Sequence, residues 1–166
     1  MHKRNGFSLI ELLVVVAIIL TIAAIAVPSF LRSRMAANEA SAVGSMRMIS
    51  TAQVTYSSTY PTLGFAPDLN TLGPGTTAGA TSSSANAELL DNVLGCPAGV
   101  GTDPCQKSGY NLNITAGTGT PLNTYSLNAN PTALGKTGLR YFFSDNSGVI
   151  RYNPTIIATS ADQSLQ

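Results

Sequence analysis

The sequence predicts an α+β protein in which the helical part comes first and the strands come last. Three observations support this class. An apolar run covers residues 7–27, and apolar positions then continue at a helical period to residue 57. Four short runs rich in β-branched and aromatic residues follow residue 110.

The apolar run at 7–27 is long enough to cross a membrane. At about 1.5 Å per residue, a helix over this run spans roughly 31 Å, which matches a bilayer core of about 30 Å. The run is bounded by Gly6 and Pro28. His2, Lys3 and Arg4 precede the run and predict that the N-terminus lies on the cytoplasmic side of the membrane. Arg32 and Arg34 lie beyond the run and weaken this bias.

One acid, Glu11, interrupts the apolar run. An ionised carboxylate deep in hydrocarbon costs on the order of 3 kcal/mol, and less near the interface, where a snorkelling acid is also possible. No Lys or Arg lies between Arg4 and Arg32. If the chain were cut after Gly6, Phe7 would gain a free α-amine that could pair with Glu11 of its own chain or of a neighbouring chain.

The hexapeptide GFSLIE, followed by LLVVVAIILTIAAIAVP, resembles the N-terminal signal of type IV pilins and type II secretion pseudopilins. The resemblance covers about residues 5–34. It implies that a membrane-embedded peptidase cuts between Gly6 and Phe7 and methylates Phe7. It also implies that Glu11 docks on the α-amine of the next subunit, that Pro28 kinks or melts the helix during assembly, and that the long helix packs on an antiparallel sheet.

Two other classes of N-terminal segment are alternatives to this resemblance. An ordinary secretory signal peptide would be cut at a small-residue site, for which Ala24-Ile25-Ala26 qualifies. A plain single-span anchor would not be cut at all. The run is longer than a usual signal-peptide core, and neither class explains a Gly-Phe step before a lone Glu11.

Residues 29–57 predict an amphipathic continuation of the helix, which makes a helix of about 75 Å over 7–57. The apolar or small positions that form one stripe are Phe30, Leu31, Met35, Ala36, Ala40, Val43, Met46, Ile49, Gln53 and Tyr56. The polar residues expected on other faces are Arg34, Asn38, Glu39, Ser45 and Arg47. The stripe is expected to pack on a domain of the same chain, and small residues allow close helix approach.

Beyond the helix, Tyr60-Pro61 and a Pro-, Gly-, Thr- and Ser-rich stretch predict a long loop, with a short helix at 87–94. The four predicted strands are 110–115, 123–128, 139–144 and 148–152, and the last two form a hairpin around Asp145-Asn146-Ser147. The predicted organisation is a leader at 1–6, a membrane and filament-core helix at 7–28, its continuation at 29–57, a variable loop region at 58–109, a sheet at 110–153 and a loose tail at 154–166.

Cys96 and Cys105 are expected to form a disulfide, because the folded part would lie in an oxidising compartment; free thiols are the alternative. A zinc site is not expected, since His2 is the only histidine. Asp145, Asn146 and Ser147 could offer oxygens to calcium, but one carboxylate makes a poor cage. We therefore expect neither a metal nor a cofactor.

The sequence predicts a structural protein and no enzyme. A single histidine leaves no Ser-His-Asp or Cys-His arrangement, and no phosphate-binding loop occurs between a strand and a helix. Charged residues make up 10% of the chain and the net charge is +1, so nucleic-acid binding is not expected.

The prediction is a type IV pilus subunit that forms a helical homo-oligomer through 7–57. The resemblance implies a prepilin peptidase and an inner-membrane assembly platform as partners. The subunit would be a single-pass inner-membrane protein before it enters an extracellular pilus. A pseudopilin of a periplasmic type II secretion filament is the alternative. The long loop after residue 58 and the cysteine pair favour the pilus.

Overall fold

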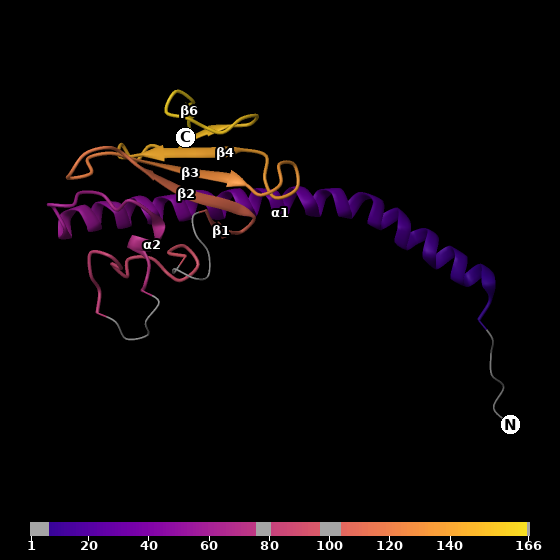
Figure 1. Cartoon of the computed structure of the whole chain (residues 1–166). Helices are drawn as coiled ribbons and strands as arrows, with labels where there is room; N and C mark the ends of the chain where they lie inside the picture. Colours follow the sequence, from indigo (N-terminus) through magenta and orange to yellow (C-terminus); the bar gives the residue numbers. More distant parts are fainter. Residues whose placement is uncertain (1–6, 76–80, 97–103, 166) are drawn as a thin grey trace. The chain divides into compact units, whose positions relative to one another are not determined.

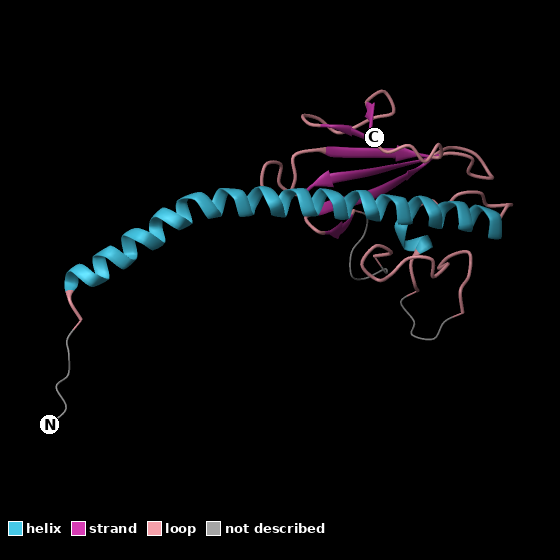
Figure 2. Ribbon diagram, turned by 180° about the vertical axis from the view of Figure 1, so that it is seen from behind, coloured by secondary structure: helices cyan, strands magenta, loops and turns pink. Residues whose placement is uncertain are grey.

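The computed structural model describes residues 7–75, 81–96 and 104–165. Its longest element is helix α1, Leu9–Thr59, of 51 residues. The chain divides into two compact units, Met1–Arg34 and Met35–Gln166, and α1 contributes to both. The elements are labelled in Figure 1 and coloured by type in Figure 2.

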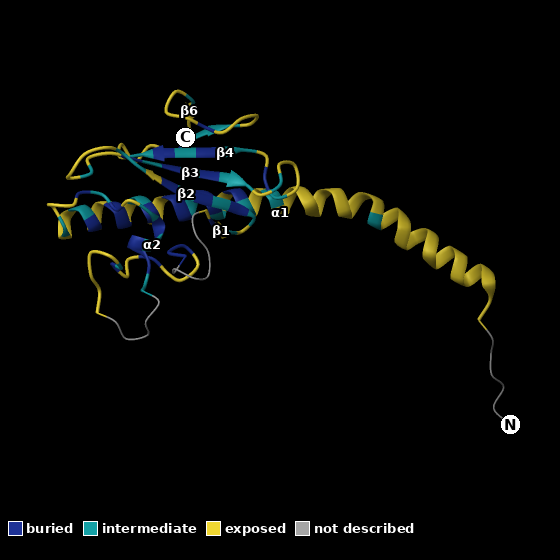
Figure 3. Ribbon diagram, in the orientation of Figure 1, coloured by how far each residue is buried: buried dark blue, intermediate teal, exposed yellow. Residues whose placement is uncertain are grey.

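In the first unit, the residues of α1 are exposed along almost the whole helix (Figure 3), and most of them are apolar. Phe7, Leu9 and Ile25 are each more than 70% exposed. Among the described residues, α1 is the one helix long and apolar enough to cross a membrane. The helix continues through Pro28, which has no N–H to donate to the carbonyl of Ala24.

The second unit packs the C-terminal part of α1 against an antiparallel sheet of six strands, which are hydrogen-bonded in sequence order. The strands are β1 Cys105–Lys107, β2 Tyr110–Ala116, β3 Tyr125–Pro131, β4 Tyr141–Asp145, β5 Arg151–Asn153 and β6 Gln163–Ser164. A short helix, α2 Leu69–Leu72, is capped by Asp68, whose Oδ1 accepts the Thr71 N–H at 2.7 Å. The predicted α+β fold is confirmed.

Buried and partly exposed residues alternate along β2, β3 and β4, so one face of the sheet lies in the core. Leu112, Leu127 and Phe142 are fully buried there, and their neighbours along each strand are partly exposed. Met46 and Ile49 of α1 are fully buried in the same cluster. Burying a side chain of this size stabilises a fold by about 1.5–3 kcal/mol, so this layer holds the helix to the sheet.

The predicted helix at 87–94 is wrong. The N–H groups of Ala87, Leu89 and Leu90 donate to carbonyls of Thr71 and Leu72, so this backbone pairs with α2 and its flank. Glu88 has a φ of 55°, which no right-handed helix accommodates. Contacts with a distant segment therefore outweigh the local helix propensity of this stretch.

Two strands lie in segments that were expected to be loops. Strand β1 lies within 58–109 and pairs with β2 through a two-residue turn at Ser108-Gly109, where both φ angles are positive, as such hairpin turns require. Strand β6 lies within the tail 154–166 and is too short to show alternation. The loop region 58–109 also contains α2, so neither segment is structureless.

The remaining differences concern element bounds. Helix α1 runs from Leu9 to Thr59 where 7–57 was expected. The three later strands begin two or three residues after their predicted starts, because the residues before each strand are not paired in the sheet. The predicted hairpin is confirmed by the antiparallel pairing of β4 and β5, and its turn is closed by the Gly148 N–H donating to the Asp145 carbonyl at 2.9 Å.

Two polar side chains expected on exposed faces of α1 are buried instead: Glu39 and Ser45. The Glu39 carboxylate accepts the Leu139 N–H at 2.7 Å and two guanidinium nitrogens of Arg140 at 2.8 Å. A buried carboxylate is tolerated when it is paired in this way. Glu39 therefore joins α1 to the segment that leads into β4.

Candidate assembly site

At the start of helix α1, the Glu11 side chain contacts the backbone of Ser8. The Ser8 carbonyl accepts the Leu12 N–H at 3.2 Å, which makes Ser8 the N-cap residue. The Glu11 carboxylate reaches back and accepts the Ser8 N–H at 2.9 Å through Oε2. This is the carboxylate half of a capping box, and the negative charge also lies at the favourable end of the helix dipole.

The capping contact brings the Glu11 carboxylate close to the start of the chain that cleavage would create. Consecutive backbone nitrogens are at most about 4 Å apart. The Phe7 nitrogen therefore lies within roughly 7 Å of Glu11 Oε2, given the 2.9 Å contact at Ser8. Gly6, the other side of the predicted cleavage site, lies outside the described residues.

The capping role of Glu11 was missed in the sequence, although its signal is present. Ser8-Leu9-Ile10-Glu11 is an S-x-x-E pattern before an apolar run. The partner of Glu11 is a backbone N–H three residues away, so it does not depend on a basic side chain.

The apolar face that follows presents few polar groups. Thr21 is the one hydroxyl within 9–27, and it donates to the Ala17 carbonyl at 2.8 Å. A shallow groove of about 350 Å³ runs beside it and is lined by Leu13, Val14, Ala17, Ile18, Thr21 and Ile22. Since every hydroxyl of this stretch is satisfied within the helix, the surface suits lipid or another apolar helix.

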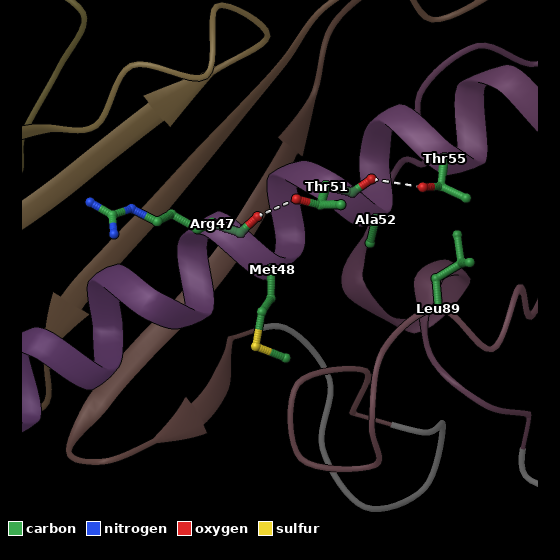
Figure 4. A pocket seen from close by; sticks show the side chains of 6 residues that line it. All are labelled: Arg47, Met48, Thr51, Ala52, Thr55 and Leu89. Carbon is green, nitrogen blue, oxygen red and sulfur yellow. Dashed lines mark hydrogen bonds between the residues drawn. The ribbon is translucent and has the colours of Figure 1, made fainter.

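A second groove lies on the part of α1 that belongs to the folded unit (Figure 4). Its volume is about 380 Å³, and it is lined by Arg47, Met48, Thr51, Ala52, Thr55 and Leu89. Thr51 donates to the Arg47 carbonyl and Thr55 to the Thr51 carbonyl, both at 3.0 Å. Both hydroxyls are therefore hydrogen-bonded within the helix. The groove presents mainly apolar surface, and its lining shows no pair of side chains suited to catalysis.

Two of the three tyrosines with raised pKa values, Tyr56 and Tyr110, act as structural donors. Burial, followed by the nearby Glu39 carboxylate, raises the pKa of Tyr110, and its hydroxyl donates to the Arg140 carbonyl at 2.9 Å. Burial is also the main reason that the pKa of Tyr56 is raised, and its hydroxyl donates to the Ser84 carbonyl at 2.7 Å. Both phenols stay protonated and hold segments of the fold together.

Metal ligands do not gather in the part of the chain that the structure describes, where no three His, Cys, Asp or Glu side chains come together. At the turn considered for calcium, Asp145 Oδ1 accepts the Ser147 N–H at 2.8 Å. This contact is the usual turn chemistry of aspartate.

The predicted disulfide between Cys96 and Cys105 is confirmed, with the two Cα atoms 5.7 Å apart. It links the segment after α2 to strand β1. Both cysteines belong to the buried cluster of the folded unit.

Replacing Cys96 and Cys105 with serine is expected to lower the free energy of unfolding by roughly 2–3 kcal/mol, because closing a loop of this length restricts the unfolded chain by about that amount. Urea unfolding of the full chain in detergent, followed by tyrosine fluorescence, measures the change. Each single variant should match the double variant. An unchanged unfolding midpoint in all three would contradict this role.

The fold and the N-terminal segment together define an α+β protein with a pilin-like architecture. Residues 1–27 match the family model of the prokaryotic N-terminal methylation motif. Among curated proteins, the chain is similar to the type IV major pilin protein PilA of Myxococcus xanthus (strain DK1622), with 37% identity over 73 residues. That match spans 40% of this chain and only 33% of the relative. The comparison with solved structures gives no match.

The motif and the pilin relative confirm the predicted resemblance to the type IV pilin family. They support a pilin-type structural subunit. The particular roles of Gly6, Phe7, Glu11 and Pro28 stay predictions.

Proposed function

We propose that this chain is the subunit of a type IV pilus, cut between Gly6 and Phe7, methylated on Phe7 and polymerised through α1. The main support for the proposal is that the methylation motif at 1–27 overlaps the exposed apolar part of α1. The same helix continues into a folded α+β unit. Before assembly the subunit spans the inner membrane with its N-terminus in the cytoplasm. An assembly platform in that membrane then transfers it to the filament.

Transfer from lipid to a filament core changes the apolar environment little, because lipid tails are as apolar as neighbouring helices. Burial of 7–27 therefore gives a subunit little preference for the filament. A charged pair between Glu11 and the Phe7 amine of the next subunit can supply that preference, since such pairs are strong where water is excluded. It also fixes the axial register of neighbouring helices.

The capping contact gives the Glu11 carboxylate a hydrogen-bond partner while the unassembled subunit is in the membrane. Its carboxylate accepts the Ser8 N–H of its own chain at 2.9 Å. A hydrogen bond to a neutral amide is weaker than a pair with an ammonium group. The carboxylate is thus stabilised in the monomer without losing its preference for the charged amine of a neighbour.

Mass spectrometry of the mature protein is expected to find N-methyl-Phe7 as the first residue, with residues 1–6 removed. Replacing Gly6 with valine should leave the leader attached, since a peptidase that reads this step has little room for a larger residue. A mature chain beginning at Met1 would exclude cleavage, and one beginning at Val27 would indicate an ordinary signal peptidase at Ala24-Ile25-Ala26.

Shearing of intact cells separates the pilus from the secretion pseudopilus. A pilus subunit should be recovered in long surface fibres. A protein retained with the cell envelope after shearing, with exoprotein export lost on its deletion, would favour the pseudopilin.

A further inference from the structure

The loop between β3 and β4 carries two exposed leucines on either side of a lysine. Leu134 and Leu139 are 47% and 52% exposed, and Lys136 between them is exposed as well. The loop, residues 132–140, reads TALGKTGLR and contains no acid. Single exposed apolar residues are ordinary on a protein surface. Apolar side chains next to a cation are instead the combination that binds the interface of a membrane.

Contacts within the folded unit hold the two leucines in place. The Gly135 N–H donates to the Gly138 carbonyl at 2.9 Å. A bridge pairs Leu134 with Gly138, which is the residue before Leu139. Gly138 also lies so close to the Tyr110 ring that a Cβ atom would overlap it. The loop is therefore ordered before it binds anything, which lowers the entropy that binding would cost.

The same loop is fixed to the first part of α1 that belongs to the folded unit. Asn38 Nδ2 donates to the Thr137 carbonyl at 2.9 Å. The Glu39 carboxylate accepts the Leu139 N–H at 2.7 Å. Figure 1 shows the loop in orange beside α1, beyond the end of β3. Since the apolar run 7–27 ends only about three helical turns before Asn38, the chain ties this loop to the segment that follows a membrane span.

The charges of the connecting segment indicate which surface the loop meets. Arg32 and Arg34 are exposed, and no acid lies between Pro28 and Glu39. Glu39 is itself paired with Arg140 at 2.8 Å. Phospholipid headgroups carry anionic phosphates, which attract basic residues next to a membrane span. The sequence on both sides of this junction is therefore complementary to lipid in charge as well as in its exposed leucines.

We propose that the loop 132–140 rests on the outer surface of the inner membrane before assembly, with Leu134 and Leu139 among the phospholipid headgroups and Lys136 paired with a phosphate. The inference rests on the proposed function, because it requires a subunit that first spans the membrane. The lysine stem can lie along apolar surface while its ammonium group reaches the phosphate. The loop gives the subunit a second hold on the bilayer, which entry into a filament has to release.

A single introduced tryptophan tests the contact, because the chain contains none. The full chain with Leu134→Trp is reconstituted at low density in vesicles of phosphatidylcholine and phosphatidylglycerol, with brominated lipids as quenchers. We expect blue-shifted emission that the brominated lipids quench. Val54→Trp replaces a residue that is 62% exposed on α1, and it is the matched control that should emit as in water. Both variants should keep the thermal midpoint of the natural chain in circular dichroism.

Second substitutions in the Leu134→Trp chain separate the two kinds of contact. Lys136→Ala should lower the ratio of lipid-bound to free loop about fivefold in the anionic vesicles, which is the effect of one cation near such a surface. Leu139→Ser should lower the same ratio, because it removes apolar area from the interface. Equal quenching in both double variants and in Leu134→Trp alone would overturn the proposal.

Carbonate extraction of the vesicles distinguishes this inference from the proposed function. If the chain resists extraction but Leu134→Trp emits like Val54→Trp, the loop does not touch lipid and only this inference fails. Blue-shifted emission without quenching would assign the loop to a protein partner and would also overturn the inference alone. Release of the chain by carbonate would overturn both, since the subunit would then not span the membrane.

Discussion

Replacing Glu11 with glutamine is expected to abolish filaments while leaving the chain inserted in the membrane. Glutamine can accept the Ser8 N–H as glutamate does, since both residues serve in capping boxes. It has no charge to pair with the Phe7 amine of a neighbour. Removing one partner of a pair shielded from water costs about 3–5 kcal/mol per contact, which lowers the subunit association constant at least a hundredfold.

Membrane fractionation and electron microscopy of sheared material measure the two effects. Glu11→Ala removes both the cap and the charge, so it should fray the start of α1 in addition to blocking assembly. Thr21→Ala, within the same apolar stretch, is the matched control and should assemble normally. Filaments from Glu11→Gln at natural abundance would show that the contact with Ser8, and not the charge, is what assembly requires.

Replacing Glu39 with alanine is expected to lower the free energy of unfolding by about 2–4 kcal/mol. The substitution leaves the Leu139 N–H and the Arg140 guanidinium without their acceptor. Breaking a fully buried pair costs about 3–5 kcal/mol, and the estimate is reduced here because the Arg140 side chain is 36% exposed. Arg140 would retain its position over the Phe142 and Tyr152 rings, 5.4 and 5.2 Å from their centroids.

Glu39→Gln separates the two contacts, because it keeps an acceptor for the Leu139 N–H and loses the charge. It should destabilise less than alanine does. The exposed acid Glu88 supplies the control, and Glu88→Gln should leave the unfolding midpoint unchanged. Equal midpoints for the Glu39→Ala variant and the natural chain in urea would show that this pair does not hold the helix to the sheet.

The parts of the fold that depend on local pattern were predictable. The apolar run and the helical period predicted α1 to within two residues at each end, and short runs of β-branched and aromatic residues predicted the four main strands. The parts that depend on distant partners were not. Glu39 has the pattern of an exposed helix residue, and only Arg140, 101 positions away, explains its burial. Residues 87–94 have helix propensity, but their backbone pairs with α2.

The functional features also differ in whether they can be found from sequence. The Gly6-Phe7 step, Glu11 and Pro28 can be found from sequence because they form one contiguous motif. The capping box was also present in the sequence as a short spacing from Ser8 to Glu11. The alignment of Asn111 with Asn130 and of Asn113 with Asn128 could not be found from sequence, since it exists only once the register of β2 and β3 is known.

The continuity of α1 through both units has a mechanical consequence. A pull on the backbone of α1 would reach the folded unit at the first contacts that the helix makes there. Those contacts come from Asn38, Glu39 and Ser41, which bind Thr137, Arg140 and Ser108 respectively. Tension along the helix would therefore act on these three polar contacts before it acts on the buried residues that follow, Ala42, Val43 and Met46.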